Sequence, residues 1–290
     1  MAFTTFLPTI WEARLLANFH NRSLASVIST KPTKIEGKKI TFGNVGSITV
    51  KDYTGTVTYD DLEIPEVELN LDQKKYFAFK VDDVDRVQAA GPLIDEHTQE
   101  AAYTMAEVGD KYVFSLLSSK AGTKIGDKNA HEKNAYDLIV DMGTKLNKKK
   151  VPKANRYCVI DSEYLGLLSK DPRFTNNPKI LENGIVEGQL INTMQICVSE
   201  ELPVASSKTT IIALHSLGLG YGMQLDEVEA LRLQGSFADA VRGLEVYGAA
   251  SLKPEAVVTM NVSIVEAPAT QVNVVNTTDA PVNTKEVASA

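Results

Sequence analysis

The stretch Tyr76-Phe-Ala-Phe-Lys-Val-Asp-Asp-Val-Asp85 decides how the rest of the chain is interpreted. Its apolar residues alternate as far as Val81, which is typical of a β-strand with one buried face. Three aspartates follow, and Gly91-Pro92 then ends the strand pattern and allows a helix to begin. We therefore predict a strand that leads directly into a helix.

The predicted helix is unusually long. Between Pro92 and Ser119 apolar residues recur every three or four positions, and acidic residues cover the other side. Such a helix would extend ~42 Å, whereas the average helix has about 11–12 residues. A coiled coil is the alternative, but the run ends too soon for sustained heptads.

Upstream of this helix, residues 39–81 predict a β-hairpin of two long strands joined by a polar turn region. The thirteen residues 39–51 alone would span ~43 Å at ~3.3 Å per residue, too far to lie inside a domain of this size. An isolated hairpin is marginal in water, and its bare edges invite pairing. We therefore expect this hairpin to lie on another surface.

Composition excludes several classes of protein. The chain has 290 residues, of which 43% are hydrophobic and 23% charged, so it is not wholly disordered. Its net charge of −7 does not draw it as a whole onto nucleic acid. Two cysteines cannot form a disulfide framework, and no apolar run approaches the ~20 residues that span a bilayer. The first eighteen residues lack the basic stretch of a secretory signal, so we expect the chain to stay in the cytosol.

The remaining chain predicts an α+β organisation. Residues 1–38 form an arm in which Trp11, Leu15 and Phe19 make one helical stripe. A polar loop at 120–129 precedes a mixed α/β region, and three longer strands follow between 219 and 265. Within the mixed region we predict helices at about 132–149 and 162–168 and strands at 157–160, 185–191, 194–198 and 209–214.

A search for chemistry finds no catalytic, cofactor or metal site. Gly218-Leu-Gly220-Tyr-Gly222 follows a strand, but neither a lysine nor a helix follows it, so a turn or β-bulge is favoured over a phosphate loop. The four histidines lack metal-site spacing, and Cys158 and Cys197 lack the setting of a nucleophile.

A run of cations follows the helix predicted at 132–149. It is interpreted as cations at a helix C-terminus, with a face toward DNA or a negatively charged partner as the alternative. No aromatic residues interleave to stack on bases. The run consists of Lys145, Lys148, Lys149, Lys150, Lys153 and Arg156.

The order of these elements resembles the major capsid protein of tailed bacteriophages. The likeness is carried by residues 76–85 at the junction of the hairpin with the long helix, and by Val241-Arg-Gly-Leu-Glu-Val-Tyr-Gly248 with Lys253-Pro254-Glu255. The resemblance implies an N-terminal arm, an extended hairpin loop, a spine helix, a peripheral domain and an axial domain. In this sequence they would be the arm at 1–38, the extended loop at 39–81, the peripheral domain with its spine helix at 82–130, the axial domain at 131–213, strands returning to the peripheral domain at 214–266, and a tail at 267–290.

The resemblance implies a structural protein, not an enzyme, that assembles with itself into pentamers and hexamers of an icosahedral phage head. It further implies scaffold, portal or decoration proteins as partners and packaged DNA on the inner face without sequence specificity. The chain would assemble in the host bacterial cytoplasm and reside in the virion. A nanocompartment shell and a nucleotide-binding α/β enzyme are the alternatives. The residues predicted to contact other subunits are Trp11, Phe19, Ile48, Tyr53, Phe77 and Phe79.

Overall fold

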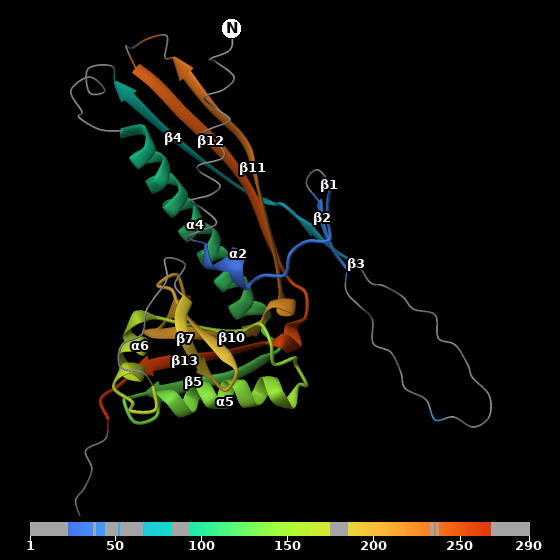
Figure 1. Cartoon of the computed structure of the whole chain (residues 1–290), viewed down its shortest axis with the longest axis vertical. Coiled ribbons are helices and arrows are strands. Elements are labelled where there is room, and N and C mark those ends of the chain that lie inside the picture. Colours follow the sequence, from blue (N-terminus) through green and yellow to red (C-terminus); the bar gives the residue numbers. More distant parts are fainter. Residues whose placement is uncertain are drawn as a thin grey trace, which may run out of the picture.

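The computed structural model describes residues 23–36, 39–43, 52, 66–82, 93–174, 185–232, 235 and 238–267. These residues form an elongated part, in which one long helix covers a sheet, and a rounder part with a larger sheet of its own (Figure 1). This mixture of helices and sheets confirms the predicted α+β class.

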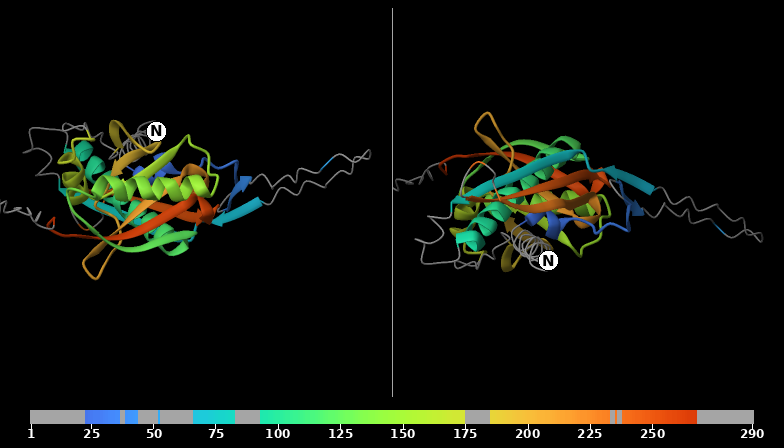
Figure 2. Two further views of the ribbon diagram at one scale, coloured as in Figure 1. Left: turned by 90° about the horizontal axis from the view of Figure 1, so that it is seen from below. Right: turned by 90° about the horizontal axis from the view of Figure 1, so that it is seen from above.

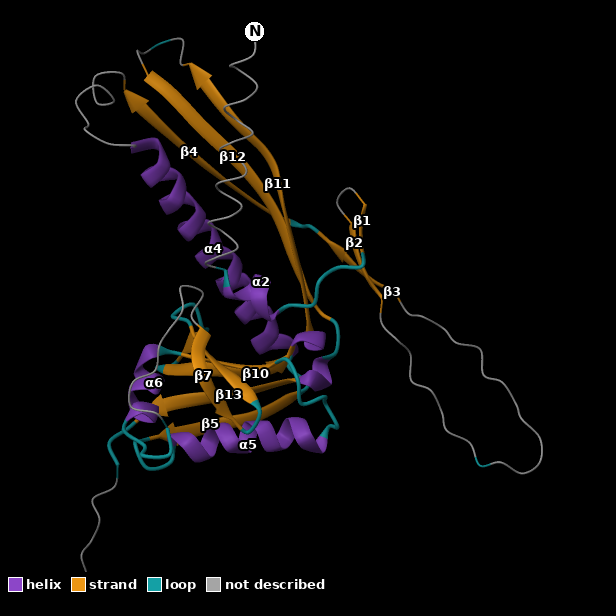
Figure 3. Cartoon of the chain, in the orientation of Figure 1, coloured by secondary structure: helices purple, strands orange, loops and turns teal. Residues whose placement is uncertain are grey.

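The elongated part is built on β4 (Gln73–Asp82), β11 (Leu219–Arg232) and β12 (Ala238–Ser251). The strands lie in the order β11-β12-β4, and both pairings are antiparallel. Helix α4 (Leu93–Lys120) covers one face of this sheet (Figure 3). Its 28 residues confirm the predicted helix at 92–119 to within one residue at each end.

Helix α4 also joins the two parts. Ala102 and Ala106 in its first half are buried against Val241 of β12. Phe114 and Leu117 in its second half are fully buried in a cluster to which both sheets contribute. One side of α4 packs on the protein, and its other side is polar. This arrangement explains the narrow apolar stripe in the sequence of the helix.

The rounder part has a seven-stranded sheet in the order β5-β13-β10-β6-β8-β7, with β9 paired to β10. The pairs β5–β13 and β6–β8 are parallel, and the others are antiparallel. Helices α5 and α6 bury one face of the sheet, and the other face packs against α4. The elements are β5 (Thr123–Ala130), α5 (Ala135–Lys148), β6 (Arg156–Ile160), α6 (Ser162–Ser169), β7 (Ile185–Ile191), β8 (Met194–Val198), β9 (Val204–Ala205), β10 (Lys208–His215), η1 (Ser216–Gly218), η2 (Pro254–Ala256) and β13 (Val257–Ile264).

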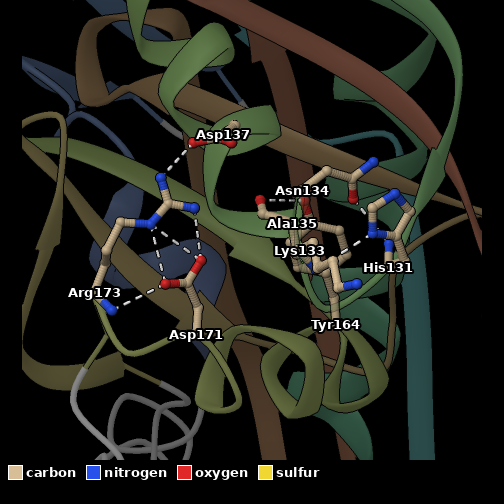
Figure 4. A network of polar contacts seen from close by, with 8 residues as sticks. All are labelled: His131, Lys133, Asn134, Ala135, Asp137, Tyr164, Asp171 and Arg173. Carbon is tan, nitrogen blue, oxygen red and sulfur yellow. Dashed lines mark hydrogen bonds and ion pairs between the residues drawn. The ribbon is translucent and has the colours of Figure 1, made fainter. Parts of the chain in front are cut away.

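Polar contacts fix how α5 and α6 meet (Figure 4). The Tyr164 hydroxyl donates to the Ala135 carbonyl over 2.8 Å, which ties α6 to the first turn of α5. Arg173, beyond α6, pairs through two nitrogens with Asp171 and through Nη1 with Asp137 of α5. These contacts hold the end of α6 onto α5, because a forked guanidinium pair restricts both distance and orientation.

Strand β5 differs from the predicted loop at 120–129. It lies at the sheet edge and pairs parallel with β13 alone. Most of its side chains are exposed, and only Ala130 is fully buried. An edge strand with two solvated sides leaves no apolar alternation in the sequence, so the polar composition was misread as a loop.

Strand β13 differs from the predicted return to the peripheral sheet. It lies between β10 and β5 in the larger sheet, although β11 and β12 do join β4. Val257 packs on one side of that sheet, and Val258 and Met260 pack on the other. The larger sheet, which holds the described strands of the region 131–213, therefore takes one of its inner strands from the end of the chain.

The predicted hairpin at 39–81 divides into two structures. Strands β2 (Lys39–Gly43) and β3 (Glu66–Asn70) pair antiparallel, as predicted for the hairpin. The clearest strand of the pattern, β4, pairs instead with β12 over residues 73–82. Alternation reports one buried face, but it does not identify the partner strand.

Candidate assembly interface

The base of the hairpin is seated on the elongated sheet. Strands β1 (Lys34–Glu36), β2 and β3 form a small antiparallel sheet at one side of the body, which Figure 2 shows in two views. Ile40 and Phe42 of β2 and Leu69 of β3 are buried in a cluster with Val246 of β12. The described strands of the hairpin are therefore held by an apolar anchor on the sheet face opposite α4.

Glycines in β11 make this anchor possible. A Cβ atom added at Gly222 would overlap Cδ1 of Ile40, and one added at Gly220 would lie 2.9 Å from Cε2 of Phe42. Both glycines are strand residues, and the strand continues to Arg232 with no helix after them. The motif at 218–222 is therefore not a phosphate loop, because such a loop requires a helix N-terminus here. Gly218 does end the turn η1, but Gly220 and Gly222 lie in regular strand and not in the predicted turn or β-bulge.

The segment before the hairpin is attached to α4 by a buried carboxylate. Helix α2 (Leu24–Ile28) begins at Ser23, and the Asp110 carboxylate accepts from the Ser23 hydroxyl over 3.0 Å. It also accepts from the backbone N–H groups of Leu24 and Ala25, over 3.0 and 2.9 Å. Burial raises the pKa of Asp110 to about 6, although the three donors favour its ionised form.

A second buried acid lies beneath helix α4. Glu245 of β12 is 1% exposed, and its Oε1 atom accepts no hydrogen bond from the described residues. The hydroxyl of Tyr221, on the neighbouring strand β11, is likewise buried without a described partner. Burial raises the pKa of Glu245 to about 7. Neither acid was found in the sequence, because a strand or helix pattern does not reveal a carboxylate that faces inward.

The structure places two of the six predicted contact residues. Phe77 and Phe79 lie half-buried on the α4 side of β4, with ring centroids 6.2 Å apart. They pack against the buried cluster of Ala102, Met105 and Val241 within the same chain. Their contact with another subunit stays a prediction, as it does for Trp11, Phe19, Ile48 and Tyr53, which lie outside the described residues.

His131 and the two cysteines have structural surroundings. His131 accepts from the Lys133 N–H through Nδ1 in the turn before α5 (Figure 4). Cys158 and Cys197 are free thiols on opposite faces of the larger sheet, and burial raises the pKa of Cys158 to about 12. Among the described residues, no three metal-ligating side chains gather at one place. In the same part of the chain, no helix combines the length and apolarity needed to cross a membrane.

Comparison with known proteins gives a consistent result. The sequence model of the family described as phage capsid protein matches residues 66–260. No curated protein matches the sequence.

Solved structures match over most of the chain. A structure of Mycobacterium phage Che8 is 29% identical, covers 84% of this chain and 89% of its own, and has a TM-score of 0.60. The capsid of the cyanophage P-SCSP1u is 16% identical, with coverages of 82% and 87% and a TM-score of 0.62. A virus-like particle from Pyrococcus furiosus is 13% identical, with coverages of 90% and 100% and a TM-score of 0.59.

Proposed function

The chain belongs to the phage capsid protein family, and on that premise we propose that its copies assemble through pentamers and hexamers into an icosahedral head around double-stranded DNA. A structural role in a capsid shell follows from the family and the fold. Assembly into pentamers and hexamers and the enclosure of DNA are the parts that we propose.

The anchored hairpin is the observation that supports the proposal most directly. Its base is held on the sheet by buried apolar contacts, and among the described residues β3 is the outer strand of its small sheet. An outer strand can offer its backbone groups to another chain. A hairpin on one subunit that meets a different surface of the next makes a heterologous contact, and such contacts close into rings.

The proposed partners follow from the same role. Scaffold, portal and decoration proteins would meet the shell during assembly, and packaged DNA would face its inner side without sequence readout. The net charge of −7 fits a wall that encloses DNA without binding it tightly. Assembly would take place in the cytoplasm of the host bacterium, and the product would be the capsid of the virion.

Electron microscopy of the purified protein tests the proposal. We expect closed shells, sheets or tubes to form under assembly conditions, with particles that have fivefold and sixfold clusters. A protein that sediments as a monomer over the whole range of salt and concentration would contradict it.

A nanocompartment shell is the second candidate. Its support is the Pyrococcus furiosus virus-like particle, whose whole chain is covered by the match. The contents of purified particles decide between the two. DNA that is protected from nuclease supports the phage head, whereas a co-purifying cargo protein with no nucleic acid supports the nanocompartment.

A further inference from the structure

A pocket with a basic rim lies where α5 ends and the turn η2 begins. It has a volume of about 460 Å³, and we call it the basic pocket. Lys149 and Lys150 approach it from the end of α5, and Lys253 approaches it from the residue before η2. Leu217 and Leu252 supply apolar lining, and Leu217 is 39% exposed. We call the three lysines the rim of the basic pocket and the two leucines its floor.

The described residues do not neutralise the positive charge of the rim. No ion pair joins Lys149, Lys150 or Lys253 to an acid within the described ranges, and Glu255 is the single acid in the lining. Further exposed lysines stand on the same end of α5 and the loop after it. They are Lys145, Lys148 and Lys153.

Arg156 adds a buried positive charge beneath the rim. Its guanidinium donates to the carbonyls of Val151 and Pro152, to Asn147 Oδ1 and to Thr193 Oγ1, none of which carries a negative charge. Burial, together with the charges of Arg156 and Lys253, lowers the pKa of His215. The pKa of His215 therefore responds to charge on this side of the molecule, in addition to burial.

The backbone at Lys150 shows how α5 ends. The N–H of Lys150 donates to the Asn147 carbonyl and that of Val151 to the Leu146 carbonyl, which is the Schellman ending of a helix. Lys150 occupies its left-handed position with φ 56°, where glycine is the usual residue. A lysine at this position costs roughly 1 kcal/mol against glycine, so Lys150→Gly removes a charge of the pocket without a loss of folding stability.

We propose that the basic pocket docks an acidic peptide segment of a partner protein, with one apolar side chain on the floor and the flanking carboxylates against the lysines. An apolar floor favours a peptide over DNA, because a phosphate backbone presents no apolar group to fill it. The inference concerns a single subunit and holds whether or not the shell encloses DNA.

Fluorescence anisotropy on the full-length protein tests the docking site. The probe is a short labelled peptide with one leucine between pairs of glutamates. We expect the double variant Lys149→Glu/Lys253→Glu to bind it roughly tenfold more weakly or worse, since two attractive charges become repulsive. The matched control Lys128→Glu/Lys170→Glu changes the net charge equally at exposed sites elsewhere and should bind as the original chain does. Equal losses in both variants, or no loss in the first, would overturn the proposal.

Two further probes separate docking from general attraction to anions. A peptide with serine in place of leucine should bind several-fold more weakly, and a short DNA duplex should bind more weakly than the leucine peptide. Equal binding of the serine peptide, or tighter binding of the duplex that the double variant abolishes, would overturn the peptide assignment. Self-association that the peptide does not compete with, but that the double variant abolishes, would instead assign the pocket to a second copy.

Two readouts exclude a merely structural effect. Lys150→Gly should weaken peptide binding while leaving the unfolding midpoint unchanged or higher. In nuclear magnetic resonance titrations, saturating peptide should raise the pKa of His215, because carboxylates then offset the nearby cations. A His215 titration that does not move while the peptide is bound would place the peptide elsewhere.

Discussion

Glu245 has the least favourable surroundings of the acids described above. Its carboxyl lies under α4 with one oxygen unpartnered among the described residues, and burial raises its pKa from 4.5 to about 7. The folded chain therefore holds this proton more tightly than the unfolded chain. Stability linked to Glu245 is full below about pH 4.5 and is lost as the pH rises to about 7.

Glu245→Gln should remove this loss. We expect the variant to be more stable than the original chain by roughly 2–3 kcal/mol at pH 8 and equally stable near pH 4, because glutamine has the same shape and no charge to bury. Urea unfolding at several pH values measures the difference. A variant whose stability falls with pH as steeply as before would assign the pH dependence to another group, Asp110 being the first to examine.

At the scale of elements, β4 presents two different faces. The side chains of Phe77 and Phe79 face α4. The side chain of Tyr76, which precedes them in β4, is 79% exposed. Phe79→Asp should destabilise the subunit by about 3 kcal/mol and abolish both solubility and shells, because it places a carboxylate under α4. The measurements are the soluble yield and the unfolding midpoint.

The neighbouring change Tyr76→Asp is the matched control for β4. It adds the same charge on the exposed face, and its unfolding midpoint should equal that of the original chain within the error of the measurement. If Tyr76→Asp folds normally yet forms no shells, this face of β4 contacts another subunit. If Phe79→Asp folds and assembles normally, the described packing against α4 is wrong.

The anchor of the hairpin gives a second prediction at this scale. Gly222→Ala forces its new methyl group into Ile40, which is 1% exposed and cannot turn away freely. We expect a loss of about 1–3 kcal/mol and fewer shells, with partial recovery of both in Gly222→Ala/Ile40→Val, where the overlapping methyl group is removed. Gly166→Ala, whose Cβ would meet nothing within 4 Å, serves as the control. No recovery in the double variant would show that Ile40 is not the obstacle.

At the scale of the whole molecule, the elongated and the rounder part are joined where α4 ends against η2. The Gly122 N–H donates to the Pro254 carbonyl over 2.9 Å. A Cβ atom at Gly122 would lie 2.6 Å from the Pro254 carbonyl carbon and 2.9 Å from the Glu255 nitrogen. Because these are backbone atoms, no side chain can move aside, and the two parts of the subunit must shift relative to each other.

Gly122→Ala should therefore lower stability by about 2–3 kcal/mol and disturb shell geometry in whatever subunits fold. Calorimetry gives the first effect, and micrographs of the particles give the second. Normal particles of normal stability from this variant would mean that the junction tolerates movement and does not set the angle between the two parts.

The sequence by itself determined the elements whose apolar pattern is unambiguous. Helix α4 was predicted close to its observed bounds because its apolar residues repeat with the helical period. Strands β6, β8 and β10 were predicted close to theirs because they are short apolar runs, as strands buried on both faces are. The N-cap of α6 is likewise local, since the Asp161 carboxylate accepts from the Tyr164 N–H over 2.8 Å. A local hydrogen bond of this kind needs only residues that are neighbours in sequence.

Only the tertiary structure decided which strands meet and which polar groups lie inside. Strand β4 joins β12, β13 joins the larger sheet, and the polar strand β5 exists because β13 offers it an edge. Asp110 and Glu245 are buried because of what packs over them, and Lys149 and Lys253 line one pocket because two distant segments end there. Alternation along a chain records that one face is covered, whereas the identity of the cover depends on contacts between residues far apart in sequence.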